Sequence, residues 1–295
     1  MTIRMTIAFL ALLPAVLTDA AETHAYGNAD EAGKDANLPV FILAGQSNMD
    51  GAGVVEELPV ELKGPQTNVL FAQFWSTEFK PLDPMKLGKS FGPEVTFGSE
   101  MARGLNRPVG IIKMSAGGTS LERHWNPVTI DREDRYVGAN YRGLIGYVKS
   151  VQARHKNIRI AGMIWMQGEA DAQFHSKTVE QYRDKLEALI DGCRKEFGVP
   201  DLPFVCGRIS CGGQYRKQVR EAQETVKREN YVWIDCDDLE KHPDKLHYSS
   251  RGQLELGRRF AAAMLKLIED NRKKAGAPED RPQGGVDAEK RGEAR

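Results

Sequence analysis

A serine follows a short apolar segment near the start of the chain, in Gly45-Gln46-Ser47-Asn48-Met49. Residues 39–44 are apolar and end at glycine, which is typical of a buried strand followed by a turn or a helix. Ser47 would then lie at the carboxyl end of that strand, where open α/β sheets place their active sites. A serine there can also serve only as the N-cap of the next helix. Its position therefore makes Ser47 a candidate nucleophile.

An aspartate and a histidine stand three positions apart much later in the chain, in Asp244-Lys245-Leu246-His247. On a turn, the carboxylate of Asp244 can hold one imidazole nitrogen of His247 while the other nitrogen reaches a serine hydroxyl. Serine hydrolases use this arrangement of nucleophile, base and orienting acid. His242 is the only rival base, and it lacks an aspartate at the matching offset. Ser47, Asp244 and His247 together predict a catalytic triad.

Two further segments carry groups that suit ester chemistry. Ester hydrolysis develops negative charge on the carbonyl oxygen, and donors held at that oxygen contribute strongly to catalysis. Gly117 and Gly118 follow the apolar segment 109–114, and a backbone N–H there can approach a substrate without a side chain in the way. Gln167 closes the apolar segment 160–166 and carries a side-chain amide. The alternatives are a plain turn for the glycines and a buried structural amide for Gln167.

Four blocks of sequence together resemble the SGNH (GDSL-like) hydrolases, and within them the carbohydrate acetylesterases of family six and the sialate O-acetylesterase-like domains. The blocks are Gly45-Gln46-Ser47-Asn48-Met49, then Gly117-Gly118-Thr119-Ser120-Leu121-Glu122 with Trp125 close behind, then Trp165-Met166-Gln167-Gly168-Glu169-Ala170-Asp171, and last Asp244 to His247 followed by Gly252-Gln253. They extend over nearly the whole globular part of the chain. Ala170 replaces the serine that is common in the third block, and we expect this change to be tolerated because both residues are small.

The resemblance implies a fold and an activity. The fold would be α/β, the three-layer α/β/α, flavodoxin-like SGNH hydrolase fold with a parallel central sheet. The activity would be hydrolysis of acetyl esters on carbohydrates by a serine esterase that resembles acetylxylan esterases. A sialate or other sugar O-acetylesterase is the alternative within this class. A noncatalytic carbohydrate-binding relative is the alternative outside it, but such a protein would be expected to lose a member of the triad.

The resemblance also implies roles for individual residues. The catalytic residues would be Ser47, Asp244 and His247, with no metal and no organic cofactor. The oxyanion hole would consist of three groups, namely the backbone N–H of Ser47, the backbone N–H of Gly117 or alternatively of Gly118, and the side-chain amide of Gln167. The partners would be an acetylated carbohydrate and water.

Four more residues in or near these blocks invite a functional interpretation. Glu169 and Asp171 suggest the paired carboxylates of a glycosidase, but no second acid partner is identifiable. We expect Glu169 to anchor the serine segment or the glycine turn by hydrogen bonds. Arg123 and Trp125 follow the glycine turn and are candidates for lining the substrate pocket, although Trp125 can equally pack on the core.

The pattern of apolar residues predicts the elements that position these groups. Strands are expected at residues 40–44, 69–74, 109–114, 160–166, 203–209 and 231–234, and helices at residues 94–105, 144–154, 179–197, 216–228 and 252–268. Strands separated by helices predict a parallel sheet that is covered on both faces. This conclusion from periodicity agrees with the fold that the resemblance implies.

Composition limits the class of protein. The chain has 295 residues with 41% apolar side chains, which is enough for one sizeable core. Its 41 basic and 41 acidic residues cancel. A balanced charge argues against a binder of nucleic acid or of anionic membranes, because such proteins usually carry an excess of basic residues. A neutral sugar ester would suit such a surface.

The first twenty residues have the pattern of a secretory signal. Arg4 precedes an apolar run at residues 7–17, and Thr18-Asp19-Ala20 ends in a small residue that suits cleavage. The run is short for a membrane span, and no cysteine follows it to carry a lipid anchor. A buried first helix is the alternative, but Pro14 would interrupt it. We therefore expect a secreted or periplasmic protein without a membrane span in its mature form.

The chain is expected to divide into four parts. Residues 1–20 would be the signal peptide, residues 21–37 a flexible lead, residues 38–270 the hydrolase domain, and residues 271–295 a disordered polar tail. The cysteines all lie in the second half of the domain, at Cys193, Cys206, Cys211 and Cys236. Export would permit a disulfide among them, and free buried thiols are the alternative. Their spacing is not that of a zinc site.

Overall fold

The computed structural model describes residues 37–276, except residues 74, 129–130, 132 and 175–178. The expected signal peptide, all but the last residue of the expected lead, and the expected tail beyond residue 276 lie outside the described residues. None of the helices in the described part of the chain combines the length and the apolar character that crossing a bilayer requires.

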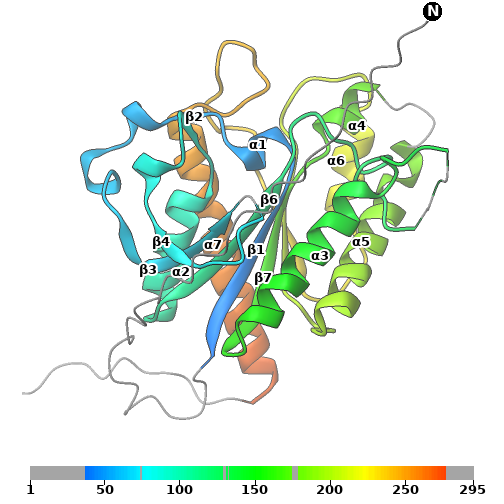
Figure 1. The fold of residues 1–295 in the computed structure, drawn as a ribbon. Helices are drawn as coiled ribbons and strands as arrows, with labels where there is room; N and C mark the ends of the chain where they lie inside the picture. The colour runs from blue at the N-terminus through cyan, green and yellow to red at the C-terminus, as the bar shows by residue number, and fades with distance from the viewer. Residues whose placement is uncertain (1–36, 74, 129–130, 132, 175–178, 277–295) are drawn as a thin grey trace, which may run out of the picture. The chain divides into compact units, whose positions relative to one another are not determined.

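A central sheet organises the domain (Figure 1). Within the described residues it has seven strands in the order β4-β3-β6-β1-β7-β8-β9. The strands are β1 (Leu38–Gly45), β3 (Gln66–Gln73), β4 (Lys80–Leu82), β6 (Val109–Ser115), β7 (Ile158–Met166), β8 (Phe204–Gly207) and β9 (Tyr231–Ile234). Neighbouring strands pair in parallel, except that β4 pairs with β3 in the antiparallel direction. A separate ribbon pairs β2 (Gly53–Val54) with β5 (Ser90–Phe91).

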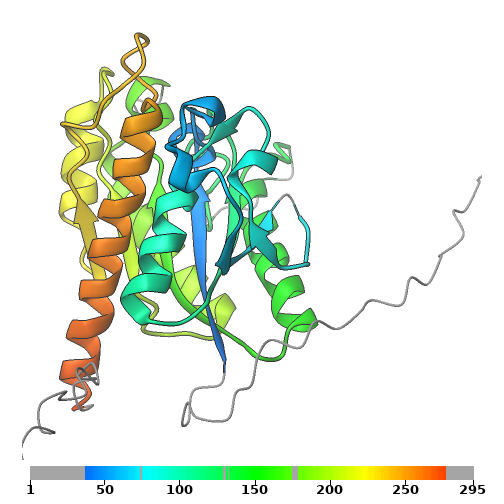
Figure 2. The ribbon, with the colours of Figure 1, turned by 90° about the vertical axis from the view of Figure 1, so that its left-hand side faces the viewer.

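Helices cover both faces of the sheet (Figures 1 and 2). One face carries α2 (Glu94–Leu105) and α7 (Ser250–Lys274), which pack against each other. The other carries α3 (Ala139–Arg154), α5 (Tyr182–Phe197) and α6 (Arg216–Glu224). The short helices are α1 (Ser47–Asp50) and α4 (Glu169–Phe174), together with the 3₁₀ turns Val55–Glu57, Val60–Leu62, Pro84–Lys86 and Val179–Gln181. The structure thus confirms an α/β fold in three layers around a mostly parallel sheet.

The expected strands and helices are found in the expected order, but most of them begin or end at residues other than those predicted. The bounds of α2 and β9 match the prediction. Helix α7 begins earlier than expected because Ser249 accepts a hydrogen bond from the N–H of Gly252 and so caps it. It also continues to Lys274, so the first residues of the expected tail are helical. Strands β2, β4 and β5 and helix α4 were not predicted.

The ends of the three central strands bring distant segments together. Gly45 at the end of β1 pairs with Ser115 of β6 and with Met166 of β7. A side chain at Gly45 would clash, because its Cβ would lie 2.0 Å from the carbonyl oxygen of Met166. The segments that follow these strands therefore meet at one edge of the sheet, which is where parallel sheets bind ligands.

The cysteines are free thiols, which was one of the two expected alternatives. All four are buried, at Cys193, Cys206, Cys211 and Cys236. Burial raises the pKa of the Cys206 thiol to about 12. Thiols in such surroundings are inert at neutral pH, so these side chains contribute packing to the core.

Candidate active site

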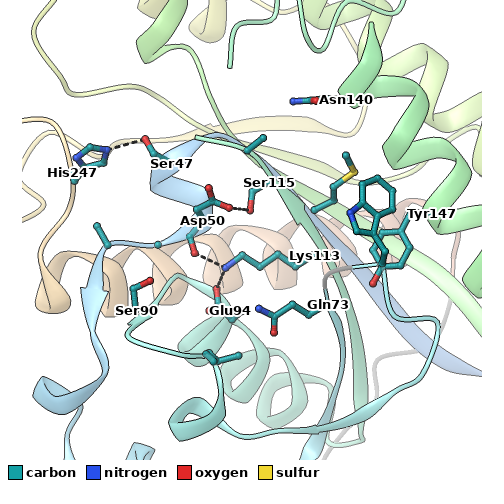
Figure 3. Close-up of a pocket in the computed structure, with 16 residues that line it drawn as sticks. Ser47, Asp50, Gln73, Ser90, Glu94, Lys113, Ser115, Asn140, Tyr147 and His247 are labelled. Carbon is teal, nitrogen blue, oxygen red and sulfur yellow. Dashed lines mark hydrogen bonds and ion pairs between the residues drawn. The ribbon is translucent and has the colours of Figure 1, made fainter. Parts of the chain in front are cut away.

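The structure brings together the serine, the histidine and the aspartate that the sequence predicts as a triad. The Nε2 atom of His247 lies 3.0 Å from the hydroxyl oxygen of Ser47 (Figure 3). Its Nδ1 atom lies 2.7 Å from Oδ2 of Asp244. Ser47 begins α1 directly after β1, whereas the other two residues lie on the loop before α7. The imidazole therefore connects the carboxylate to the serine hydroxyl.

Asp244 is held in an orientation that suits this contact. Its Oδ1 atom accepts hydrogen bonds from the backbone N–H groups of Leu246 at 2.9 Å and His247 at 3.0 Å. Partial burial works to raise the pKa of Asp244, but hydrogen bonds from the backbone and side chain of His247 and from the Leu246 N–H lower it to about 2. The carboxylate is therefore ionised at neutral pH, with its other oxygen free to face the imidazole.

His242, the rival base, lies elsewhere. Its Nε2 atom contacts the carbonyl oxygen of Ala52 at 2.8 Å.

Asn48 ties the serine segment to the histidine loop. Its side-chain amide donates to the carbonyl oxygen of Leu246 at 3.1 Å and to Oε1 of Glu169 at 2.7 Å. Its side-chain oxygen accepts from the N–H of Tyr248 at 3.1 Å. These contacts lie on either side of His247 in the sequence, so they fix the loop relative to the serine. The sequence offered one signal for this role, which is the position of Asn48 next to Ser47.

Glu169 and Asp171 lie in the first turn of α4 and serve different segments. Glu169 is buried beneath the serine segment. Burial raises the pKa of its carboxyl group, and the hydrogen bond from Asn48 offsets only part of that effect. Asp171 accepts backbone hydrogen bonds from Leu121 at 2.9 Å and Glu122 at 3.1 Å. The two carboxylates therefore hold the serine segment and the segment after the glycine turn, and neither faces the pocket.

Gln167 differs from its expected place in the oxyanion hole. Its side chain is fully buried, and its amide donates to the carbonyl oxygen of Thr119 at 3.1 Å and to Oδ2 of Asp171 at 2.5 Å. The side-chain oxygen of Gln46 lies 3.3 Å from the same nitrogen, and the hydroxyl of Tyr182 donates to the amide oxygen at 3.0 Å. The amide hydrogens are therefore used inside the protein. This is the geometry of the alternative, a buried structural amide.

Replacing Gln167 with alanine should accordingly lower the melting temperature and leave kcat per folded molecule within a few-fold. The substitution leaves buried polar partners without their hydrogen bonds, which costs about 1–3 kcal/mol. Thermal unfolding and hydrolysis of an acetyl ester should be measured on the same preparation. Gln218→Ala, at an exposed position on α6, is the matched control. A loss of kcat of about a hundredfold at an unchanged melting temperature would instead assign the amide to the oxyanion.

The glycine turn lies beside the serine. A Cβ atom added to Gly117 would lie 3.7 Å from the Cβ atom of Ser47, whereas one added to Gly118 would contact nothing within 4 Å. The N–H of Gly117 meets no acceptor among the described residues. Gly118 has a φ of +69°, the left-handed conformation that favours glycine in a turn. Of the two glycines, Gly117 is therefore the better placed to donate to a substrate at Ser47.

Arg123 and Trp125 do not line the pocket next to Ser47. Arg123 pairs with Asp134 through two hydrogen bonds of 2.7 Å and 3.1 Å. Trp125 is fully buried, with its ring edge-on to Trp165 at a centroid distance of 5.1 Å. Arg123 therefore lies outside this pocket and stays an untested candidate for a supporting role, and Trp125 follows the alternative of packing on the core.

A pocket of about 680 Å³ opens beside Ser47 and His247 (Figure 3). The residues that line it include a buried ion pair, in which Nζ of Lys113 lies 2.6 Å from Oε2 of Glu94. The same nitrogen donates to the carbonyl oxygen of Asp50 at 2.8 Å. The Asp50 carboxylate accepts a hydrogen bond from the hydroxyl of Ser115. No cluster of three or more metal-binding side chains is found in the part of the chain that the structure describes.

Comparisons with known proteins identify several carbohydrate esterases that are similar to this chain. A probable carbohydrate esterase of Arabidopsis thaliana is 29% identical over 252 residues, which cover 77% of this chain and 90% of that protein. A solved structure of an Arabidopsis thaliana protein has a TM-score of 0.67 and 26% identity, covering 78% of this chain and 98% of the other. A carbohydrate acetylesterase from Xanthomonas citri has a similar fold, with a TM-score of 0.63 at 19% identity, covering 79% of this chain and 56% of the other.

A family model described as "carbohydrate esterase, sialic acid-specific acetylesterase" matches residues 37–266. This match covers the whole sheet and the triad. The chain therefore belongs to this family of carbohydrate esterases.

Proposed function

We propose that this esterase uses Ser47 as a nucleophile to release acetate from an acetylated carbohydrate. One observation carries the proposal, namely the contact of His247 with the Ser47 hydroxyl at 3.0 Å while Asp244 holds the opposite imidazole nitrogen at 2.7 Å. A nucleophile within hydrogen-bonding reach of an oriented base is the arrangement that acyl transfer requires.

The reaction follows from this arrangement in two steps. His247 accepts the hydroxyl proton as Ser47 attacks the acetyl carbonyl carbon, and the ionised Asp244 stabilises the resulting imidazolium. The ester bond then breaks, and His247 returns the proton to the departing sugar oxygen. A water molecule next attacks the acetyl-serine with His247 again as base, which releases acetate and restores the hydroxyl. The backbone N–H groups of Ser47 and Gly117 would donate to the oxyanion in both steps.

The charge of the pocket favours a neutral sugar, such as acetylated xylan, over a sialic acid. Among the pocket residues that the structure describes, Lys113 is the only lysine or arginine, and Glu94 neutralises it. Asp50, which lines the same pocket, adds a negative charge. A sialic acid carries a carboxylate that would need a cationic partner here, because buried like charges repel. The family description supports the sialate alternative, and the assay below distinguishes the two.

Release of acetate from three substrates tests the proposal. We expect the purified protein to act on acetylated xylan at a higher kcat/KM than on acetylated pectin or O-acetyl sialic acid, since the latter two carry carboxylates. A higher kcat/KM on O-acetyl sialic acid would assign the enzyme to the alternative substrate. No acetate from any of the three, at protein concentrations that hydrolyse a simple acetyl ester, would contradict a carbohydrate substrate.

Export from the cytoplasm is the second part of the proposal. It is supported by Arg4 and the apolar run at residues 7–17, which have the pattern of a signal peptide. The enzyme would then meet polysaccharide outside the cytoplasm, as a secreted or periplasmic protein. N-terminal sequencing of the mature protein from its own host tests this, because an intact Met1 would exclude cleavage.

A further inference from the structure

We propose that the wall of the pocket opposite the triad is a binding site for an uncharged pyranose ring, with the indole of Trp75 as its platform. The inference rests on the proposed function, because the ring would belong to the sugar whose acetyl group lies at Ser47. Figure 3 shows that Gln73, Asn140 and Tyr147 lie on the side of the pocket away from Ser47 and His247. These three residues and Trp75 line the same pocket as the catalytic serine.

Trp75 is an exposed aromatic side chain in a fixed position. Its side chain is among the large apolar ones left exposed, with 60% of its surface accessible. The ring nevertheless packs against Tyr147, with the centroids 5.4 Å apart. A Cβ atom added to Gly143 of α3 would lie 3.0 Å from the indole, so a glycine there leaves room for the ring. The indole is therefore braced from one side and open to solvent.

The bracing residue is itself fixed. Tyr147 is buried, and its hydroxyl donates to the carbonyl oxygen of Ser76 at 2.9 Å. Ser76 in turn donates its N–H to the carbonyl oxygen of Gln73 at 3.0 Å, which closes the turn that carries Trp75. The platform is thus connected by hydrogen bonds to the end of β3.

The backbone of Trp75 has an unfavourable conformation. Its φ is +66°, in the left-handed region that large side chains rarely adopt. Residues that keep such conformations tend to lie at ligand sites, where the surrounding structure compensates for the strain. Because most of the Trp75 side chain is exposed, its burial offsets little of this strain, and the strain indicates a role in binding.

An unpaired donor lies on the same wall. The Nδ2 atom of Asn140 is buried and has no hydrogen-bond partner among the described residues. Such a donor is destabilising unless a ligand or a water molecule accepts its hydrogens. A sugar hydroxyl or ring oxygen can accept them, and the Gln73 amide offers further donors and an acceptor.

The chemistry of these groups matches a pyranose better than other ligands. One face of a pyranose presents C–H groups that pack on an aromatic ring, and its edge presents hydroxyls that pair with amides. None of Trp75, Gln73, Asn140 and Tyr147 carries a charge, and the nearby Lys113 is neutralised by Glu94. A pocket of about 680 Å³ is of the size that binds sugar-sized ligands.

Binding of xylotetraose, measured by titration calorimetry, tests the platform without any catalytic step. We expect Trp75→Ala to weaken binding by about tenfold or more, because loss of a stacked aromatic contact costs about that factor. Trp75→Phe should restore most of the affinity, since it keeps a ring. Asn140→Ala should weaken binding by several-fold. Trp233→Ala is the matched control, because this exposed indole packs against Arg208 away from the pocket and should leave the affinity unchanged.

Kinetics with two substrates give the second readout. Trp75→Ala should raise KM for acetylated xylo-oligosaccharides by about tenfold and should affect hydrolysis of ethyl acetate much less, because ethyl acetate has no ring to stack. Equal affinity of wild type and Trp75→Ala for xylotetraose would overturn the inference, as would tighter binding of sialic acid than of xylotetraose. A parallel loss on both substrates, accompanied by a lower melting temperature, would also overturn it by assigning Trp75 to stability. Failure of the proposed function is distinct, since it would appear in wild type as an absence of acetate.

Discussion

Replacing Ser47 with alanine is expected to reduce kcat for acetate release by about 10⁴-fold or more, with the melting temperature little changed. The reason is that the alanine side chain has no oxygen to form the acetyl-enzyme, whereas the remaining donors and the pocket give only a small residual rate. The measurement is initial-rate kinetics on a simple acetyl ester and on acetylated xylan, with thermal unfolding of the same samples.

Ser150→Ala is the matched control for this experiment. Ser150 lies on the exposed surface of α3, where its hydroxyl donates to the carbonyl oxygen of Gly146. Its replacement should leave kcat unchanged. If Ser47→Ala kept even a tenth of the wild-type rate, a serine nucleophile at this position would be excluded.

Replacing His247 with alanine is expected to be nearly as damaging as loss of the serine. Without the imidazole, the Ser47 hydroxyl loses the acceptor that lies 3.0 Å from it in the structure. Asp244→Asn should lower kcat less, so that it keeps a kcat roughly a hundredfold above that of His247→Ala, because the imidazole is then misoriented but still present. The double variant lacking both Ser47 and His247 should be no slower than either single variant, since groups that act as a unit do not contribute additively.

The control for the histidine is His242→Ala. Its imidazole contacts the carbonyl oxygen of Ala52 and does not reach the serine. We expect a much smaller loss of kcat for this variant. A loss at His242 that matched or exceeded the loss at His247 would mean that the base had been misassigned.

The sheet could be predicted from sequence because its central strands are buried on both faces. Strands β1, β6 and β7 are apolar over most of their length, and such runs between helical patterns are a clear sign of a parallel sheet. Strand β4 could not be predicted in this way. It has three residues with Pro81 in the middle, so it is too short to show a period of two.

The grouping of Ser47, Asp244 and His247 could be predicted because few residue types can serve as nucleophile, base and orienting acid. The hydrogen-bond partners of the Asn48 and Gln167 amides could not be predicted. Both residues follow a strand, and their surroundings differ only because the chain takes a different path after each strand. Helix α1 begins at Ser47 and directs Asn48 toward the histidine loop. Helix α4 begins at Glu169, and Gln167 before it turns inward under the glycine turn.

The aromatic residues illustrate the same limit. Trp125 was a candidate for the pocket and is buried against Trp165. Trp75 was not a candidate, yet it lines the pocket in a left-handed backbone conformation. Local propensity disfavours this conformation for tryptophan, so only the tertiary contacts of the turn can establish it.

The contacts of Asn48 join two segments that leave the ribosome at very different times. Ser47 is made early and follows the first strand of the sheet, whereas the histidine loop is made late and leads directly into α7. Asn48 can hold that loop only after the chain through Tyr248 has left the ribosome and docked. In a nascent chain, Ser47 is therefore present well before His247 is made and can contact it.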